Sequence, residues 1–244
     1  MGDLPVEVSR FATDVAADLL DAAGASLVAV YLHGSAVLGD FSVLASDIDM
    51  LVVLDDHVRA STVSAVAEVL SVDRPCPGRG LEISAVGAKE ALRPREPWPF
   101  LVHVCTIPGD LKIVFGDEGS GDPDLVLHYL VARTAGVAVF GPLPAETIGD
   151  ISLAIILEQL ANELRWAVHH ADGPYAVLNA CRALRYQADN IVCSKVGGGE
   201  WALIQGIEPA LVQPALDARR TSSTYSVSPT IETWVLAVAD AIAQ

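Results

Sequence analysis

Two aspartates, Asp47 and Asp49, lie two positions apart at the start of an apolar run that ends at Leu54. In a β-strand, side chains two positions apart project from the same face, so both carboxylates face one side while Ile48 faces the other. Two carboxylates held together repel each other unless a cation lies between them. Mg²⁺ takes oxygen ligands from one or two carboxylates and completes its shell with water and phosphates. The pair therefore predicts a Mg²⁺ site on a strand.

A glycine–serine pair, Gly34-Ser35, ends another apolar run and stands 13 positions before Asp47. Glycine lets the backbone approach a ligand closely, and the serine hydroxyl can donate a hydrogen bond to a phosphate oxygen. Alone, an Asp-x-Asp pair is most often a solvated strand edge, and a Gly-Ser pair carries less information still. Together, with apolar strands on both flanks, they predict a site for a Mg²⁺–nucleotide.

A third carboxylate, Glu82, lies in the alternating segment Leu81-Glu82-Ile83-Ser84-Ala85-Val86. This alternation places Glu82 and Ser84 on one face of an expected strand. A carboxylate near a Mg²⁺–nucleotide site could act as a general base or as a further metal ligand, and the sequence does not separate these roles. The alternative is a strand edge exposed to water.

The stretch from His33 through Asp49 resembles the nucleotidyltransferase fold of the DNA polymerase β superfamily. More closely, the chain resembles the aminoglycoside (3″)(9) adenylyltransferases, the streptomycin/spectinomycin adenylyltransferases, in which a His-Gly-Ser turn and a Ser-Asp-Ile-Asp strand are placed alike. The resemblance covers nearly the whole chain. Its later landmarks are Asp124-Leu125, Val139-Phe140-Gly141-Pro142, Leu178 to Arg182, Ser194-Lys195 and Glu200-Trp201-Ala202-Leu203.

The resemblance implies a Mg²⁺-dependent enzyme that transfers AMP from ATP to a hydroxyl of an aminoglycoside-type antibiotic, releases pyrophosphate and gives resistance. Streptomycin, spectinomycin or both are the implied acceptors. The implied site residues are Asp47, Asp49 and Glu82 for catalysis and metal, Gly34, Ser35, Ser46 and Lys195 for ATP, and Glu82, Trp166 and Asp172 for the antibiotic.

Several of these assignments have plainer alternatives. Trp166 could be an ordinary core residue of a helix, and Lys195 could be a solvated loop lysine before Gly197-Gly198-Gly199. Residues 94–124 and 169–173 depart from the better-known family members, which leaves the acceptor open. The competing functions are nucleotidyl transfer to another small metabolite or a protein, and a non-catalytic nucleotide sensor.

The elements that must position these residues fall into two groups. We expect an α/β nucleotidyltransferase domain over residues 1–148, a mixed sheet with flanking helices, and an all-α helical bundle over 149–244 that closes the ATP and antibiotic cleft. The expected strands of the first domain are 27–32, 48–54, 81–86, 100–106, 111–114 and 137–140, and its helices are 5–23, 58–70 and 124–135. The expected helices of the second are 151–170, 174–192, 207–219 and 229–243.

Composition excludes several classes of protein. The chain has 31 acidic and 15 basic residues among 244, a net charge of −16, and 52% hydrophobic residues. A chain of this length and hydrophobic content can bury a core. Its acidity argues against nucleic-acid binding and suits a cationic small-molecule antibiotic. The alternative is that the acidic residues serve only solubility, as in many acidic proteins. No apolar run spans a bilayer and no signal peptide is evident, and the four cysteines are scattered. We therefore expect a cytoplasmic monomer with free thiols.

Overall fold

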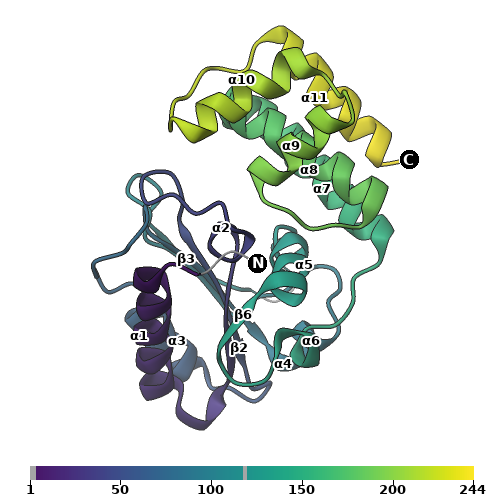
Figure 1. The fold of residues 1–244 in the computed structure, drawn as a ribbon. Coiled ribbons are helices and arrows are strands. Elements are labelled where there is room, and N and C mark those ends of the chain that lie inside the picture. The colour runs from purple at the N-terminus through teal and green to yellow at the C-terminus, as the bar shows by residue number, and fades with distance from the viewer. Residues whose placement is uncertain (1–3, 118–119) are drawn as a thin grey trace. The chain divides into compact units, whose positions relative to one another are not determined.

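The chain divides into two compact units, with the boundary between Ile151 and Ser152. The computed structural model describes residues 4–117 and 120–244 (Figure 1). The sequence placed the boundary between the two domains after residue 148. Each unit has its own hydrophobic core.

The first unit is built on a six-stranded mixed sheet with the strand order β5-β4-β3-β2-β1-β6. β2 and β3 pair in parallel, and the other neighbouring strands pair antiparallel. The expected mixed sheet is therefore confirmed. Its strands are β1 (Leu27–His33), β2 (Ile48–Leu54), β3 (Leu81–Gly87), β4 (Val102–Cys105), β5 (Lys112–Phe115) and β6 (Val137–Phe140).

One face of this sheet is covered by helices α1 (Val6–Ala23) and α3 (Ala60–Leu70), which pack against each other (Figure 1). The alternation of side chains along each strand places every second residue against α1 and α3. In β2, for example, Ile48, Met50 and Val52 belong to the core cluster that also contains the apolar positions of α1 and α3. Because strand side chains alternate, the odd-numbered residues of β2 project from the opposite face.

That opposite face carries α5 (Leu125–Ala135), with the short helices α4 (Ala88–Leu92) and α6 (Pro144–Thr147) beyond it. Tyr31 of β1 points to this side, because its hydroxyl donates a hydrogen bond to the carbonyl of Pro142 at 3.1 Å and is also bonded to Thr147 of α6. Asp49 of β2 and Glu82 of β3 project from this face, because their neighbours Ile48, Met50, Leu81 and Ile83 belong to the core on the α1 and α3 side. The pleat of the sheet thus gathers them on the side that α1 and α3 leave open.

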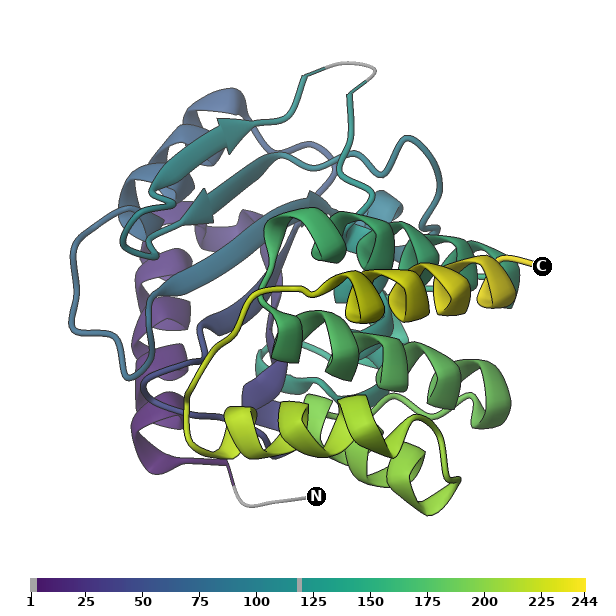
Figure 2. The same ribbon diagram turned by 90° about the horizontal axis from the view of Figure 1, so that it is seen from above.

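The second unit contains only helices among its described elements, as the sequence predicted. They are α7 (Leu153–His170), α8 (Gly173–Asp189), α9 (Lys195–Ile204), α10 (Pro209–Arg220) and α11 (Pro229–Ile242). Figure 2 shows these helices in green to yellow. Their core consists largely of small and aliphatic residues, with α8 supplying many of them. Four of these helices were expected, and α9 was not.

No helix in residues 4–117 and 120–244 is both long enough and apolar enough to cross a membrane. All four cysteines are free thiols.

Candidate active site

Five side chains form one row across the first sheet. The register pairs His33 of β1 with Asp49 of β2, Asp49 with Glu82 of β3, Glu82 with Cys105 of β4, and Cys105 with Lys112 of β5. Residues directly opposite in neighbouring strands project from the same face of the sheet. We call these five residues the cross-strand row. It brings two of the three predicted carboxylates side by side, although 33 positions separate them in the sequence.

Asp47 lies one residue before the first residue of β2, rather than within the strand as predicted. It is nevertheless close to the cross-strand row, because its charge is one of the causes that raise the pKa of Glu82. Asp47 and Asp49 are therefore both close to Glu82 at the beginning of the two parallel strands. Ser46, the residue directly before Asp47, is buried, and its hydroxyl accepts a hydrogen bond from the backbone N–H of Ser42 at 3.1 Å.

The turn between β1 and α2 (Ser35–Leu38) brings Gly34 against Asp49. Gly34 has φ +68° and ψ −149°, a conformation that is open almost only to glycine. A Cβ atom at this position would collide with the Asp49 carboxylate. The glycine is therefore required twice, once for the backbone geometry and once for the close approach of an acidic side chain.

Replacing Gly34 with alanine is expected to lower the free energy of unfolding by about 3 kcal/mol or more, because strain and collision add. Gly39→Ala is the matched control, since Gly39 also has a positive φ (+78°) but a Cβ atom there would meet no other atom within 4 Å. Strain alone should cost the control about 1–2 kcal/mol. Chemical denaturation of both variants checks this. Equal losses would show that contact with Asp49 is unimportant.

Glu82 lies in an interior strand, because β3 is paired on both sides. The alternative of a water-exposed strand edge is therefore wrong. Burial raises the pKa of Glu82 above its ordinary value of 4.5, the charge of His128 opposes this shift, and that of Asp47 adds to it. A carboxylate with a raised pKa is a better proton acceptor when ionised than an ordinary glutamate, which suits a general base.

Two histidines lie beside the carboxylates: His33, from the His-Gly-Ser turn of the resemblance, and His128, which the sequence did not single out. His33 is only 3% exposed, and its ring meets that of His128 from α5 edge-on, with 5.0 Å between centroids. Burial, and then the neighbouring His128, lower the pKa of His33 well below 6.5, so its imidazole is neutral at pH 7. His128 follows Asp124, a landmark of the resemblance, by one helical turn, and that spacing was the available signal for it.

Three buried polar atoms of this region have no hydrogen-bond partner among the described residues. They are His33 Nε2, Ser35 Oγ and His128 Nδ1. Buried polar atoms are rarely left unpaired in folded proteins, and an absent ligand or ion is a common reason. The predicted phosphate donor Ser35 is one of them, so its hydroxyl has hydrogen-bonding capacity that the described residues do not use.

The donor set fits Mg²⁺ that shares its shell with a nucleotide. Within residues 4–117 and 120–244, no group of three or more His, Cys, Asp or Glu side chains is arranged to hold a metal ion by itself. Mg²⁺ sites on nucleotides need no such cage, because one or two carboxylates supply part of the shell and substrate phosphates supply more of it. Asp47 and Asp49 meet this requirement at the turn that carries Ser35.

In the second unit, Lys195 is the first residue of α9 rather than a loop lysine. Its N-cap, Ser194, accepts a hydrogen bond from the backbone N–H of Gly197 at 3.0 Å. The glycines that follow serve packing, because a Cβ at Gly198 would press on Arg182 and one at Gly199 on Leu178 and Leu216. The Nζ atom of Lys195 lies 4.4 Å from the centre of the Tyr175 ring.

The two residues predicted to bind the antibiotic differ in their surroundings. Trp166 is 49% exposed and stacks on His170 with 5.1 Å between ring centroids, so the alternative of an ordinary core residue is wrong. Asp172 is the N-cap of α8, and its Oδ1 accepts a hydrogen bond from the backbone N–H of Tyr175 at 2.8 Å. A structural contribution of Asp172 is thus established whatever else it binds.

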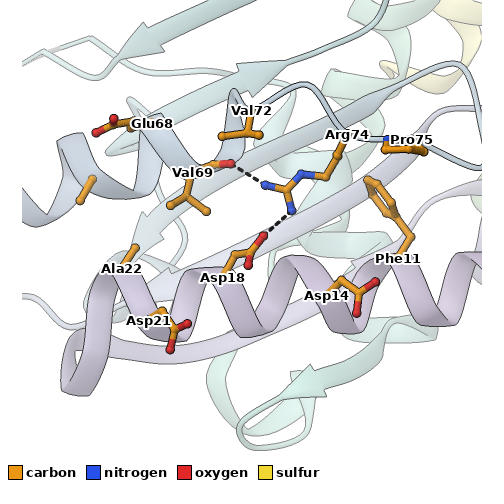
Figure 3. Close-up of a pocket in the computed structure, with 11 residues that line it drawn as sticks. Phe11, Asp14, Asp18, Asp21, Ala22, Glu68, Val69, Val72, Arg74 and Pro75 are labelled. Atoms are coloured by element: carbon orange, nitrogen blue, oxygen red, sulfur yellow. Dashed lines mark hydrogen bonds and ion pairs between the residues drawn. The ribbon is translucent and has the colours of Figure 1, made fainter.

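A cavity of about 830 Å³ lies between α1 and α3 (Figure 3). Asp14, Asp21 and Glu68 line it, and Arg74 bonds both Asp18 at 2.7 Å and the carbonyl of Val69 at 2.6 Å. Because α1 and α3 cover the face of the sheet opposite to the cross-strand row, this cavity is separate from the predicted site. Its carboxylates account for part of the net charge of −16.

Residues 16–90 match the family model described as a nucleotidyltransferase domain, so the fold and the carboxylates of the first unit define a protein of that class. Residues 138–229 match the model described as aminoglycoside adenylyltransferase, C-terminal domain. Both units of the chain are therefore similar to proteins of the aminoglycoside adenylyltransferase family.

Curated relatives and a solved structure agree with these matches. Spectinomycin 9-adenylyltransferases of Staphylococcus aureus strains Mu50 and N315 are each 26% identical to the chain over 195 residues, covering 75% of this chain and 73% of the relative. The crystal structure of spectinomycin adenyltransferase AAD(9) from Enterococcus faecialis with ATP and spectinomycin aligns with a TM-score of 0.69. That alignment covers 96% of this chain and 99% of the other at 14% identity, and it shows the shared fold.

Proposed function

We propose that the protein transfers AMP from ATP to a hydroxyl of an aminoglycoside-type antibiotic, with spectinomycin as the first acceptor to test. The observation that carries this proposal is the cross-strand row, in which Asp49 and Glu82 are neighbours. It lies beside the Gly34-Ser35 turn, whose serine hydroxyl is buried without a partner among the described residues. The match of residues 138–229 to the C-terminal domain of aminoglycoside adenylyltransferases and the spectinomycin 9-adenylyltransferase relatives support the acceptor class.

The proposed reaction forms one bond and breaks another at the α-phosphorus of ATP. Glu82 removes the proton of the attacking antibiotic hydroxyl, whose oxygen bonds to the α-phosphorus. The bond from that phosphorus to the bridging oxygen breaks, and pyrophosphate leaves. The hydroxyl of Ser35 donates to a phosphate oxygen, and Lys195 adds a positive charge. Mg²⁺ held by Asp47 and Asp49, with Glu82 as the further candidate ligand, would neutralise phosphate charge.

Each unit supplies part of this proposed site. Asp47, Asp49 and Glu82 belong to the first unit, and Lys195, Trp166 and Asp172 to the second. In our proposal the second unit closes over ATP and the antibiotic, so that its lysine reaches the same nucleotide as the two aspartates. A net charge of −16 repels free ATP, and specific cations are therefore needed to hold the triphosphate.

Two substitutions separate the helix-capping contribution of Asp172 from a contribution to antibiotic binding. Asp172→Asn keeps an N-cap oxygen but removes the charge, whereas Asp172→Ala removes both. We expect the alanine variant to lose about 1 kcal/mol of unfolding free energy and the asparagine variant to lose little. Both should raise the KM for a cationic antibiotic, and denaturation curves together with steady-state kinetics check this. An unchanged KM in the stable asparagine variant would remove Asp172 from the antibiotic site.

The direct test of the proposed function is pyrophosphate release. Purified protein is mixed with ATP, Mg²⁺ and in turn spectinomycin, streptomycin and further aminoglycosides, with a chelator control. We expect release with spectinomycin that stops when Mg²⁺ is removed. If none of these antibiotics causes release, the proposed acceptor class is wrong, and AMP found on a polypeptide by mass spectrometry would redirect the proposal to a protein acceptor.

A further inference from the structure

Lys195 lies directly over the face of a neighbouring tyrosine. Its Nζ atom is 4.4 Å from the ring centroid of Tyr175, which is within the range of a cation–π contact. The two residues begin different helices, since Lys195 is the first residue of α9 and Tyr175 lies in the first turn of α8. Lysine carries a compact charge on a flexible four-carbon stem, so a contact at its tip restricts where the charge is held.

The Tyr175 ring is itself fixed at its hydroxyl. That hydroxyl donates a hydrogen bond to Glu163 Oε1 of α7 at 2.7 Å and is also bonded to Asn179, one turn along α8. Burial, with the adjacent Glu163 charge, raises the pKa of Tyr175 well above 10, so the phenol keeps its proton and remains a donor. The ring is therefore anchored on two helices while its face supports the lysine.

A second connection joins Tyr175 to the backbone beside Lys195. Asn179 Oδ1 accepts a hydrogen bond from Arg182 at 3.0 Å, and Arg182 Nε donates to the carbonyl of Cys193 at 3.0 Å. Arg185 also donates to the carbonyl of Gly197 at 3.1 Å. Hydrogen bonds from α8 thus hold the chain on both sides of Lys195, while the Tyr175 ring holds the end of its side chain.

We propose that Tyr175 is a positioning residue for ATP binding, which acts by holding the Lys195 ammonium in the orientation that meets the triphosphate. This inference rests on the proposed function, in which Lys195 binds ATP. The face of the Tyr175 ring holds the Lys195 ammonium in place before the nucleotide binds, and the hydrogen bond from the tyrosine hydroxyl to Glu163 fixes the ring. Prearrangement lowers the entropy lost when a flexible side chain binds its ligand.

The test is a double-mutant cycle read as the Kd for ATP in the presence of Mg²⁺, measured by calorimetry on the full chain without antibiotic. We expect Lys195→Ala to weaken ATP binding about 10-fold or more, and Tyr175→Leu to weaken it on the order of 3- to 10-fold. Tyr175→Leu added to Lys195→Ala should have no further effect, because the ring acts through the lysine. The KM for ATP should rise in step, with a smaller change in kcat.

Pentafluorophenylalanine at position 175 provides a second measurement that keeps the ring's shape, for the case in which the leucine variant does not fold. Its reversed ring quadrupole should weaken ATP binding relative to Tyr175→Phe, which should differ from the wild type by less than about 3-fold. Equal effects of Tyr175→Leu with and without Lys195, or equal affinity of the two phenylalanine rings, would overturn the proposal for Tyr175. Unchanged ATP binding in Lys195→Ala would instead refute the assignment of Lys195, and this inference with it.

Discussion

Asp49→Asn is expected to lower kcat for AMP transfer on the order of 10³-fold or more. The carboxylate pairs with Glu82 in register and packs against Gly34, so asparagine preserves the shape while removing a charged metal ligand. Loss of several kcal/mol of charge stabilisation at the phosphates corresponds to about tenfold in rate for each 1.4 kcal/mol. Single-turnover kinetics with ATP, Mg²⁺ and spectinomycin measure the loss.

Asp14→Asn is the matched control for this substitution. Asp14 is an exposed carboxylate of α1 at the cavity on the other face of the sheet (Figure 3). The same chemical change there should leave kcat within about 2-fold, because exposed substitutions away from a site are close to neutral. An Asp49→Asn variant that turns over as fast as this control would show that Asp49 is not a ligand of the catalytic metal.

Glu82→Gln is expected to lower kcat by about 10²- to 10⁴-fold while the variant still binds ATP, because glutamine cannot accept the hydroxyl proton. Rapid-quench measurement of AMP transfer, together with an ATP titration, separates the two effects. Glu68→Gln, the same change on exposed α3, is the control and should keep wild-type turnover. Near wild-type turnover in Glu82→Gln would rule out its role as the base.

The same variant should be more stable than the wild type at pH 8. Burial raises the pKa of Glu82 above 4.5, so the folded state favours the protonated carboxyl more than the unfolded state does. As the pH rises from the pKa of Glu82 in the unfolded state towards its raised pKa in the folded state, the unfolded state releases the Glu82 proton first. The free energy of unfolding of the wild type therefore falls over this range. Glutamine does not titrate. Its advantage in unfolding free energy should therefore shrink as the pH falls towards about 4, and a constant difference would contradict the raised pKa.

The fold of the first unit was largely predictable because its strands have clear local patterns. Alternation in Leu81–Val86 and the apolar run Ile48–Leu54 both give strands at those positions, and the first also predicted that Glu82 and Ser84 share a face. The order of the strands was not predictable from these patterns. The row that pairs Asp49 with Glu82 depends on β2 and β3 being parallel neighbours, which local alternation does not determine.

The second unit was harder to predict where packing overrides local preference. Three consecutive glycines disfavour a helix by about 1 kcal/mol each relative to alanine, yet α9 runs through them. Gly198 and Gly199 allow α9 to approach Arg182 and Leu216 more closely than any side chain would. Lys195 consequently begins a helix over the ring of Tyr175, a contact between residues 20 positions apart that sequence spacing does not indicate.

The residues of the candidate site likewise differ in whether the sequence alone could identify them. The sequence supplied the carboxylates and the Gly34-Ser35 turn from their residue types and spacing, whereas Lys195 came only from the resemblance to the adenylyltransferases. It supplied neither His128 nor the network around Tyr175, because these residues gain their importance from helices that pack together. The cap formed by Asp172 was detectable in the Asp-Gly-Pro start of α8, a typical helix N-terminus, although it was not predicted.

The most direct test of AMP transfer to an antibiotic is the mass spectrum of spectinomycin after incubation with the protein, ATP and Mg²⁺. The proposed function predicts a product heavier by one adenylyl group (AMP less water), formed by the wild type and by Asp14→Asn but absent with Asp49→Asn or without Mg²⁺. Unmodified spectinomycin after incubation with wild-type protein that binds ATP would contradict spectinomycin as the acceptor, and unmodified streptomycin and further aminoglycosides as well would contradict the acceptor class.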